Sequence, residues 1–161
     1  MQPKLDKKDV KILKLLQENC KLSSREISNK INSPITTVFT KIKRMEKLGL
    51  IKDYKAILDA KMLDKGATAF ILASFVYRNP KTDAPLSQRD LARQISRFPE
   101  VQEVHIITGD WDILIKIKTK DVDAVGKFVI DKLRFVEGVE KTLTCMVFDT
   151  VKESTEIEVN P

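Results

Sequence analysis

The sequence contains very few of the residues that build metal centres, disulfides and catalytic dyads. Its 161 residues include one histidine, His105, and two cysteines, Cys20 and Cys145, which lie far apart in the chain. Neither cysteine belongs to a Cys/His spacing typical of a metal site, and a disulfide is not expected in a reducing compartment. His105 lies within an apolar run, where a packed histidine is far commoner than a general base. We therefore expect no metal, no cofactor and no enzyme activity.

Glycine and long hydrophobic runs are also scarce. The five glycines form no Gly-rich loop of the kind that binds nucleotide phosphates. The longest apolar run, residues 67–77, is too short to cross a bilayer, and the N-terminal segment MQPKLDKKDV lacks the apolar centre of a signal peptide. The sequence thus predicts a protein of the cytoplasm with no membrane partner.

Positive charge is abundant and unevenly distributed. The net charge is +6, but residues 1–58 hold 14 Lys/Arg against 6 Asp/Glu, whereas residues 59–161 hold 15 against 17. The positive excess therefore lies in the first third of the chain. Such asymmetry is typical of a nucleic-acid-binding module joined to a neutral domain, and a basic surface without a partner is the alternative.

Two helices are predicted at the start of this basic region. Asp6 is the expected N-cap of the first helix, which should end near Asn19. Ser23 and Glu26 form a Ser-x-x-Glu capping box, which predicts a short second helix.

The stretch from residue 32 to 51, NSPITTVFTKIKRMEKLGLI, predicts a third helix with an unusual polar face. Ser33 is the expected N-cap, Pro34 the first helical residue and Gly49 the residue just past the end. One face is apolar at helical spacing, and the opposite face holds threonines and long cations but no carboxylate. A short helix and a tight turn before a basic helix is the helix-turn-helix plan, whose last helix enters the DNA major groove. Residues 50–59 should then form an extended wing or linker strand.

The rest of the chain predicts elements in the order β-α-β-β-α-β. Strands are expected at residues 68–77, 101–108, 113–119 and 141–151, with helices that begin at Ser87 and at Asp121 or Asp123. The predicted fold class is therefore α+β. An N-terminal three-helix (winged) helix-turn-helix domain (residues 1–51) is followed by a wing and hinge (52–66). A ferredoxin-like βαββαβ domain (67–161) completes the chain, with a four-stranded antiparallel sheet and two helices.

The two helices should cover one face of this sheet and leave the other face open. We expect the open face to carry Thr142, Thr144, Met146 and Phe148, or the alternate residues of the last strand. The first strand is apolar in both alternations, which is typical of a strand buried on both faces. A second copy of the sheet is the simplest cover, so we predict a symmetric homodimer.

Four segments share a pattern with one known family. They are LDKKDVKILKLLQ (residues 5–17), KIKRMEKLGLIKDY (41–54), TGDWD (108–112) and VEKTLT (139–144). In this order they resemble the opening helix, the RIxRLExxGxIxxY signature, the TGxxD turn and the last strand of the Lrp/AsnC (feast/famine) transcription regulators. The resemblance implies a sequence-specific, DNA-binding regulator that responds to an amino acid or a related small molecule. Lys41 stands where the family has an arginine, and the Arg78–Leu86 loop is longer than the family pattern.

The DNA contacts are assigned to the second and third helices. Threonines early in the third helix suit base edges, the long cations suit phosphates or guanine edges, and the start of the second helix suits the DNA backbone. The predicted DNA-binding residues are Ser24, Arg25, Thr36, Thr37, Thr40, Lys41, Lys43, Arg44 and Lys47. Two such modules on a two-fold dimer predict a partly palindromic operator on double-stranded DNA. The resemblance further implies rings of dimers, often octamers.

By itself, the GDWD turn has the composition of an ordinary hairpin turn. The resemblance implies that this turn and the last strand form a small-molecule pocket, in which carboxylates hold an ammonium and hydroxyls meet a carboxylate. The effector-binding residues carried over are Tyr77, Gly109, Asp110, Asp112, Thr142 and Thr144. A DNA-architectural protein without an effector is the alternative function.

Overall fold

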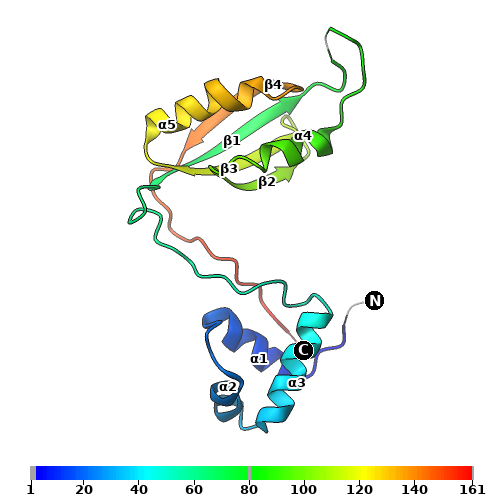
Figure 1. Cartoon of the computed structure of the whole chain (residues 1–161), viewed down its shortest axis with the longest axis vertical. Helices are drawn as coiled ribbons and strands as arrows, with labels where there is room; N and C mark the ends of the chain where they lie inside the picture. The colour runs from blue at the N-terminus through cyan, green and yellow to red at the C-terminus, as the bar shows by residue number, and fades with distance from the viewer. Residues whose placement is uncertain (1–2, 80, 161) are drawn as a thin grey trace. The chain divides into compact units, whose positions relative to one another are not determined.

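The computed structural model describes residues 3–79 and 81–160. Pro80 of the Arg78–Leu86 loop therefore lies outside the described residues. The chain divides into two compact units (Figure 1). The helical unit comprises residues 1–57 together with 152–161, and the sheet unit comprises residues 58–151. Within the described residues, no helix is long and apolar enough to span a membrane.

The helical unit contains α1 (Lys7–Glu18), α2 (Ser24–Ile31) and α3 (Ile35–Lys47). Asp6 caps α1 and Ser23 caps α2, as the sequence predicts, and the Ser23–Glu26 capping box is confirmed. Asp6 and Asp9 form a second capping box, which the sequence analysis did not predict. The apolar stripes of the three helices meet in one core, formed by Ile12, Leu13, Leu16, Ile27, Val38, Ile42 and Met45.

The start of α3 differs from the prediction, because Pro34 and not Ser33 is its N-cap residue. Ser33 still belongs to the end of α2. Its N–H donates to the Ser28 carbonyl at 3.1 Å, and its carbonyl accepts from Ser28 Oγ at 2.6 Å. The left-handed Asn32 (φ 49°) makes this turn and aims the Ser33 hydroxyl inward, where it is buried without a hydrogen-bond partner among the described residues.

The end of α3 follows the prediction, and the segment after it does not. Gly49 adopts φ +69°, and its N–H and that of Leu50 bond back to the carbonyls of Glu46 and Met45. No β-strand forms between residues 50 and 59, so the expected wing strand is wrong. Side chains 52–59 are exposed, and the described residues offer this segment no strand ladder.

The C-terminal tail packs on the helical unit. The side-chain amide of Gln17 donates to the Ile157 carbonyl at 2.9 Å and accepts from the Ile157 N–H at 2.7 Å. Val159 also packs against the helical core. The tail is therefore held both by backbone hydrogen bonds and by apolar contact.

The sheet unit has the predicted βαββαβ order. Its strands are β1 (Ala67–Phe75), β2 (Val101–Ile106), β3 (Ile113–Thr119) and β4 (Val139–Met146), which form an antiparallel sheet in the order β2-β3-β1-β4. Two helices, α4 (Gln88–Ile95) and α5 (Val122–Lys127), cover one face (Figure 1). Ser87 caps α4, and Asp121 rather than Asp123 caps α5, which continues as π-helix and 3₁₀-helix to residue 135.

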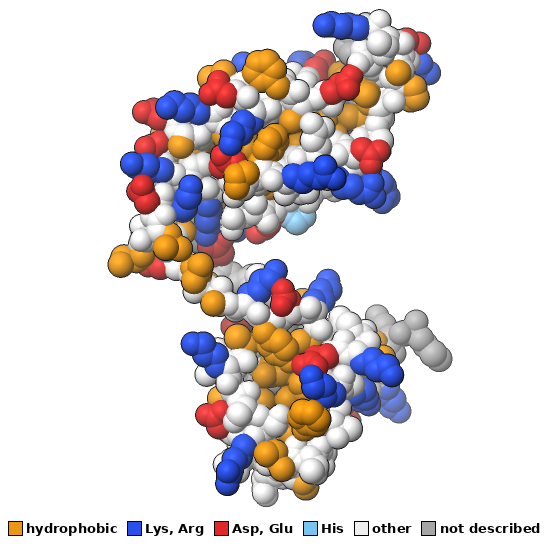
Figure 2. Space-filling view, viewed as in Figure 1, with side chains coloured by type: hydrophobic (Ala, Val, Ile, Leu, Met, Phe, Trp, Pro, Cys, Tyr) orange, Lys and Arg blue, Asp and Glu red, His pale blue; other side chains and the backbone are white. Residues whose placement is uncertain are grey.

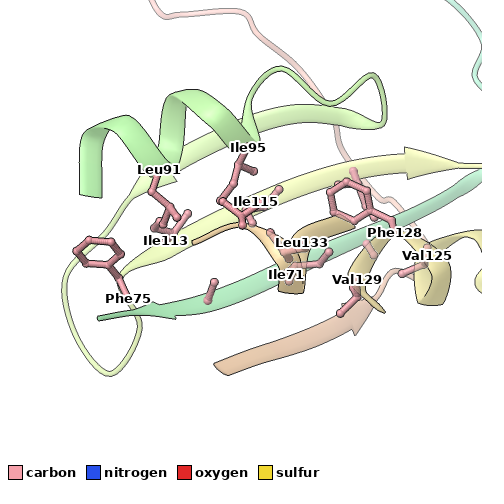
Figure 3. Close-up of a cluster of buried hydrophobic side chains, with 14 residues drawn as sticks. Ile71, Phe75, Leu91, Ile95, Ile113, Ile115, Val125, Phe128, Val129 and Leu133 are labelled. Atoms are coloured by element: carbon pink, nitrogen blue, oxygen red, sulfur yellow. The ribbon is translucent and has the colours of Figure 1, made fainter. Parts of the chain in front are cut away.

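The core of this unit lies between the helices and β1 and β3. Figure 3 shows Leu91 and Ile95 of α4 beside Ile113 and Ile115 of β3, with Ile71 of β1 close by. β4 begins and ends earlier than predicted. Met146 already pairs with Ala69 near the start of β1, which leaves residues 148–151 no partner.

The open face of the sheet carries the alternate residues of β4. Thr142 and Thr144 pair with Ala73 and Ile71, whose side chains are buried under the helices, so these threonines share the helix-covered side. Leu143 and Cys145, opposite Leu72 and Phe70, lie on the open side instead. The specific prediction for Thr142, Thr144 and Met146 is therefore wrong, and its stated alternative is right. The bulge between Ala73 and Phe75 sets the register at this end.

Gly138 and Gly126, two glycines of the sheet unit, give a stability prediction. Gly138 adopts φ +99°, and a Cβ there would lie 2.8 Å from Cε2 of Phe75. We expect Gly138→Ala to destabilise the sheet unit by about 1–3 kcal/mol, through backbone strain and overpacking. Gly126→Ala is the matched control, because its Cβ would meet nothing within 4 Å in α5 and should stabilise by about 0.5–1 kcal/mol. Urea unfolding followed by Trp111 fluorescence measures both; equal midpoints would contradict the prediction.

Candidate functional site

The outward face of α3 collects the threonines and cations predicted to meet DNA. Thr36, Thr40, Lys43 and Lys47 are exposed, and Thr37 is half-buried. Figure 2 shows hydrophobic side chains lying among Lys and Arg side chains on the visible face of this unit. An open hollow on the helix is lined by Thr36, Thr37, Thr40, Lys41 and Arg44. Its lining contains hydroxyls and cations and no carboxylate, which suits a polyanion.

Two cations of this helix are already paired with carboxylates of α1. Lys41 Nζ lies 2.5 Å from Asp6 Oδ2 and 3.0 Å from Asp9 Oδ1, and its side chain is only 16% exposed. The Arg44 guanidinium donates to Asp9 Oδ2 at 2.7 Å, although the arginine side chain is 47% exposed. Asp9 itself is 1% exposed. The structure thus links the capping box of α1 to two side chains assigned to DNA.

The contact between Asp6 and Lys41 shifts the pKa of both groups. The hydrogen bond from Lys41, supported by backbone N–H groups, lowers the pKa of Asp6 to about 2 from 3.8. Desolvation opposes the charge on Lys41, but the hydrogen bonds to Asp6 and Asp9 outweigh it and raise the lysine pKa. Both groups are therefore held in their charged forms.

The other side of α3 carries a second, more exposed set of contacts. Lys43 Nζ lies 2.8 Å from Glu46 Oε2 and 5.9 Å from the Phe39 ring centroid, and the Tyr54 hydroxyl donates to Glu46 Oε1 at 3.1 Å. The hydrogen bond from Lys43 lowers the pKa of Glu46. Burial, followed by the bond to Glu46, raises the pKa of Tyr54 to about 12. Lys47 makes no ion pair within the described part of the chain.

The two predicted DNA-backbone residues lie at the start of α2. Arg25 is exposed and Ser24 is half-buried. Ser24 does not cap the helix, because Ser23 fills that role with its hydroxyl on the Glu26 N–H at 3.3 Å. The Ser24 hydroxyl is thus not required for the cap.

Three predicted effector residues, Gly109, Asp110 and Asp112, belong to the turn before β3, which meets the C-terminal end of β1 through Asp112. Gly109 (φ +121°) and Asp110 lie in the exposed turn before β3. Asp112 N–H donates to the Ala73 carbonyl at 3.1 Å, and its Oδ2 accepts from the Phe75 N–H at 2.8 Å. Asp112 therefore holds the bulged end of β1, a role that the sequence did not reveal.

The remaining effector candidates lie on the other side of β1 and beyond its end. Thr142 pairs with Ala73 of β1, and Thr144 pairs with Ile71, two residues earlier in β1. Tyr77 follows β1 and is 64% exposed, with its ring 5.1 Å from that of Phe75 in an edge-to-face contact. The 78–86 loop is a small hairpin closed by the pairing of Arg78 with Pro85. Among residues 3–79 and 81–160, no three His, Cys, Asp or Glu side chains lie close enough together to form a metal site.

Sequence reasoning missed Asp6 and Asp9 as partners of α3. The sequence analysis predicts only the N-cap role of Asp6. Their i,i+3 spacing places both carboxylates at one helix end, which is a signal for a cation-binding pair. The identity of the cations depends on how α3 crosses α1, which local spacing does not contain.

The Asp6–Lys41 pair predicts an acid-sensitive helical unit. Because the folded pKa of Asp6 lies near 2 and the ordinary value is 3.8, its stabilisation is complete above pH 3.8 and is lost as pH falls toward 2. Asp6→Asn keeps an N-cap but should remove this part of the pH dependence. Urea unfolding followed by NMR signals of α1 amides, at about pH 5 and about pH 2.5, measures it. Glu18→Gln, an exposed acid of the same helix, is the control, and an unchanged acid sensitivity in Asp6→Asn would contradict the prediction.

Both units match known protein families. Residues 5–52 match the model of a winged helix-turn-helix DNA-binding domain, and residues 68–157 match the model of the Lrp/AsnC ligand binding domain. An uncharacterized HTH-type transcriptional regulator of Pyrococcus abyssi is 42% identical over 149 residues, which cover 92% of this chain and 96% of the relative. The leucine-responsive regulatory protein of Haemophilus influenzae is 31% identical, with 93% and 87% covered.

Solved structures give the same result. A transcriptional regulator of Neisseria meningitidis, solved as a complex with L-Met, superimposes with a TM-score of 0.89 at 30% identity and covers 98% of each chain. AsnC of E. coli, at 21% identity and a TM-score of 0.81, shares the fold. With its helix-turn-helix unit and its ligand-binding unit both matched, the chain belongs to the Lrp/AsnC family of DNA-binding transcription regulators, which are not enzymes.

Proposed function

We propose that the helical unit reads a DNA operator in the major groove through the outward face of α3. The observation that carries this is the face itself, where Thr36, Thr40, Lys43 and Lys47 are exposed together with no carboxylate on the outward side. Hydroxyl and methyl groups of threonine suit base edges and thymine methyls, and the lysines suit phosphates. Thr37 is at the edge of this face.

Further backbone contacts are proposed for the start of α2. Arg25 is exposed, and the helix cap does not use the hydroxyl of Ser24. Both side chains suit contacts with the phosphates that flank the groove. Lys41 and Arg44 line the hollow but are paired with Asp9. The cationic contacts with DNA are therefore assigned to the exposed Lys43, which also pairs with Glu46, and to Lys47. We propose residues 1–51 as the DNA-binding domain, acting in the cytoplasm.

Substitutions on α3 test this assignment. Thr40→Ala should weaken operator binding by about 1–3 kcal/mol and relax specificity at one base pair. Lys47→Ala should weaken binding to all sequences and lower the slope of log affinity against log salt by about 0.9. Fluorescence anisotropy at several salt concentrations measures both. Lys127→Ala, an exposed lysine of α5, is the control, and operator binding by Thr40→Ala and Lys47→Ala equal to that of the control would rule the assignment out.

We further propose that the sheet unit binds an amino acid at the C-terminal end of β1. The similar Neisseria meningitidis regulator, which was solved with L-Met, supports this ligand class. Asp110 is the proposed partner of the ammonium, because one oxygen of Asp112 is already held by the Phe75 N–H. Gly109 leaves the turn backbone accessible, and Tyr77, Thr142 and Thr144 complete the proposed site.

Calorimetry against the amino acids, beginning with L-methionine, tests the site. We expect saturable binding that Asp110→Asn weakens by about 1–3 kcal/mol, since a charge-assisted hydrogen bond is lost. Asp83→Asn, an exposed acid in the 78–86 loop of the same unit, is the matched control. Unchanged affinity in Asp110→Asn would show that the turn is purely structural.

The open face of the sheet supports a homodimer. Phe70, Leu72 and Leu114 lie there half-buried beside the exposed Leu143, so a second sheet would cover apolar surface. Two helical units on such a dimer fit a partly palindromic operator, and rings up to octamers are the proposed larger assembly. A monomeric mass in sedimentation would contradict the dimer.

A further inference from the structure

Asp9 is the charged side chain most deeply buried in the helical unit, and both of its oxygens are occupied. Oδ1 accepts from Lys41 Nζ at 3.0 Å. Oδ2 accepts from the Arg44 guanidinium at 2.7 Å and from the Asp6 N–H at 2.9 Å. The carboxylate itself is 1% exposed, so it depends on these donors rather than on bulk water. A buried charge persists only where its partners persist, because an unpaired one is strongly destabilising.

The two cations fasten α3 at two points on one flank. Lys41 and Arg44 are three residues apart, which separates them by just under one helical turn. A single contact leaves a helix free to rotate about its axis, but two contacts on one carboxylate restrict both rotation and sliding. The outward residues Thr36 and Thr40 lie on the neighbouring flank, so their direction follows from this anchor.

We propose that Asp9 is a positioning residue for DNA reading, and that Lys41 and Arg44 act on it rather than on phosphates. This proposal rests on the proposed reading role of α3. It assigns Lys41 and Arg44 to the α1–α3 junction and no longer to DNA. The carboxylate sets the rotation of α3, and the rotation sets where the threonines meet the base edges. Base readout depends on that rotation, whereas nonspecific attraction to phosphate depends on charge.

The experiment compares operator and non-operator DNA at several salt concentrations, with full-length protein. Arg44→Ala should lower the ratio of operator to non-operator affinity about tenfold, the equivalent of one good contact, and should leave the salt slope and non-operator binding unchanged. Lys47→Ala, by contrast, should weaken both DNAs and lower the slope by about 0.9. Arg44→Lys, which keeps a cation beside Asp9, should recover most of the ratio.

A double-mutant cycle with Asp9→Asn links the effect to the carboxylate. If Arg44 acts through Asp9, Asp9→Asn combined with Arg44→Ala should be no worse than the more damaging single change. Hydrogen exchange of α1 and α3 amides checks that each variant is folded, and Arg44→Ala, which leaves the apolar core intact, decides the question alone if Asp9→Asn unfolds.

Three results would overturn the proposal. A salt slope lowered by about 0.9 in Arg44→Ala, with both DNAs weakened, would make Arg44 a phosphate contact. Unchanged specificity in Arg44→Ala would make the anchor irrelevant to reading. If Thr40→Ala and Lys47→Ala also bind DNA like the unmodified protein, the reading role of α3 fails, and this inference fails with it.

Discussion

The helical unit depends on a buried carboxylate. Asp9 is the second residue of the capping box of α1, and its side chain is only 1% exposed. Its carboxylate accepts hydrogen bonds from the start of its own helix and from α3. Removal of one partner from a buried ion pair costs about 3–5 kcal/mol, a large part of the stability of a small domain. The same group that begins one helix therefore also fixes the direction of another. In our proposal, the stability of the helical unit and its reading of DNA both depend on Asp9.

A comparable clamp operates in the sheet unit. Asp112 bonds through its backbone to Ala73 and through its carboxylate to Phe75, on either side of the β1 bulge. The apolar core under α4 and α5 holds the sheet rigid, so the turn that carries Gly109 and Asp110 stands at a well-defined end. In each unit an aspartate carboxylate accepts from backbone or cationic donors, and we propose that the exposed polar groups near it meet the ligand.

The charge distribution agrees with this division of labour. The positive excess lies within residues 1–58, and two of the cations on α3 are neutralised at the junction with α1. Lys43 and Lys47, which are exposed and not paired with α1, lie beside the outward threonines. We therefore propose that attraction to DNA and discrimination between sequences are carried by different side chains of one helix.

Local sequence determined most of the secondary structure of this protein. The caps at Asp6, Ser23 and Ser87 and the left-handed Gly49 depend on near neighbours, so they were predictable. The family resemblance also came from short motifs in order. The side of β4 that faces the helices was left open, because strand alternation alone does not tell which alternate set points inward.

Only the tertiary structure decided the roles of single polar groups. Ser33 does not cap α3 because its backbone closes the end of α2, and the wing strand does not form because no segment of the described chain pairs with residues 52–59. Whether Lys41 and Arg44 face DNA or a carboxylate depends on how two helices cross. Spacing along the chain sets which face a side chain is on, but contacts between distant segments set what that face meets.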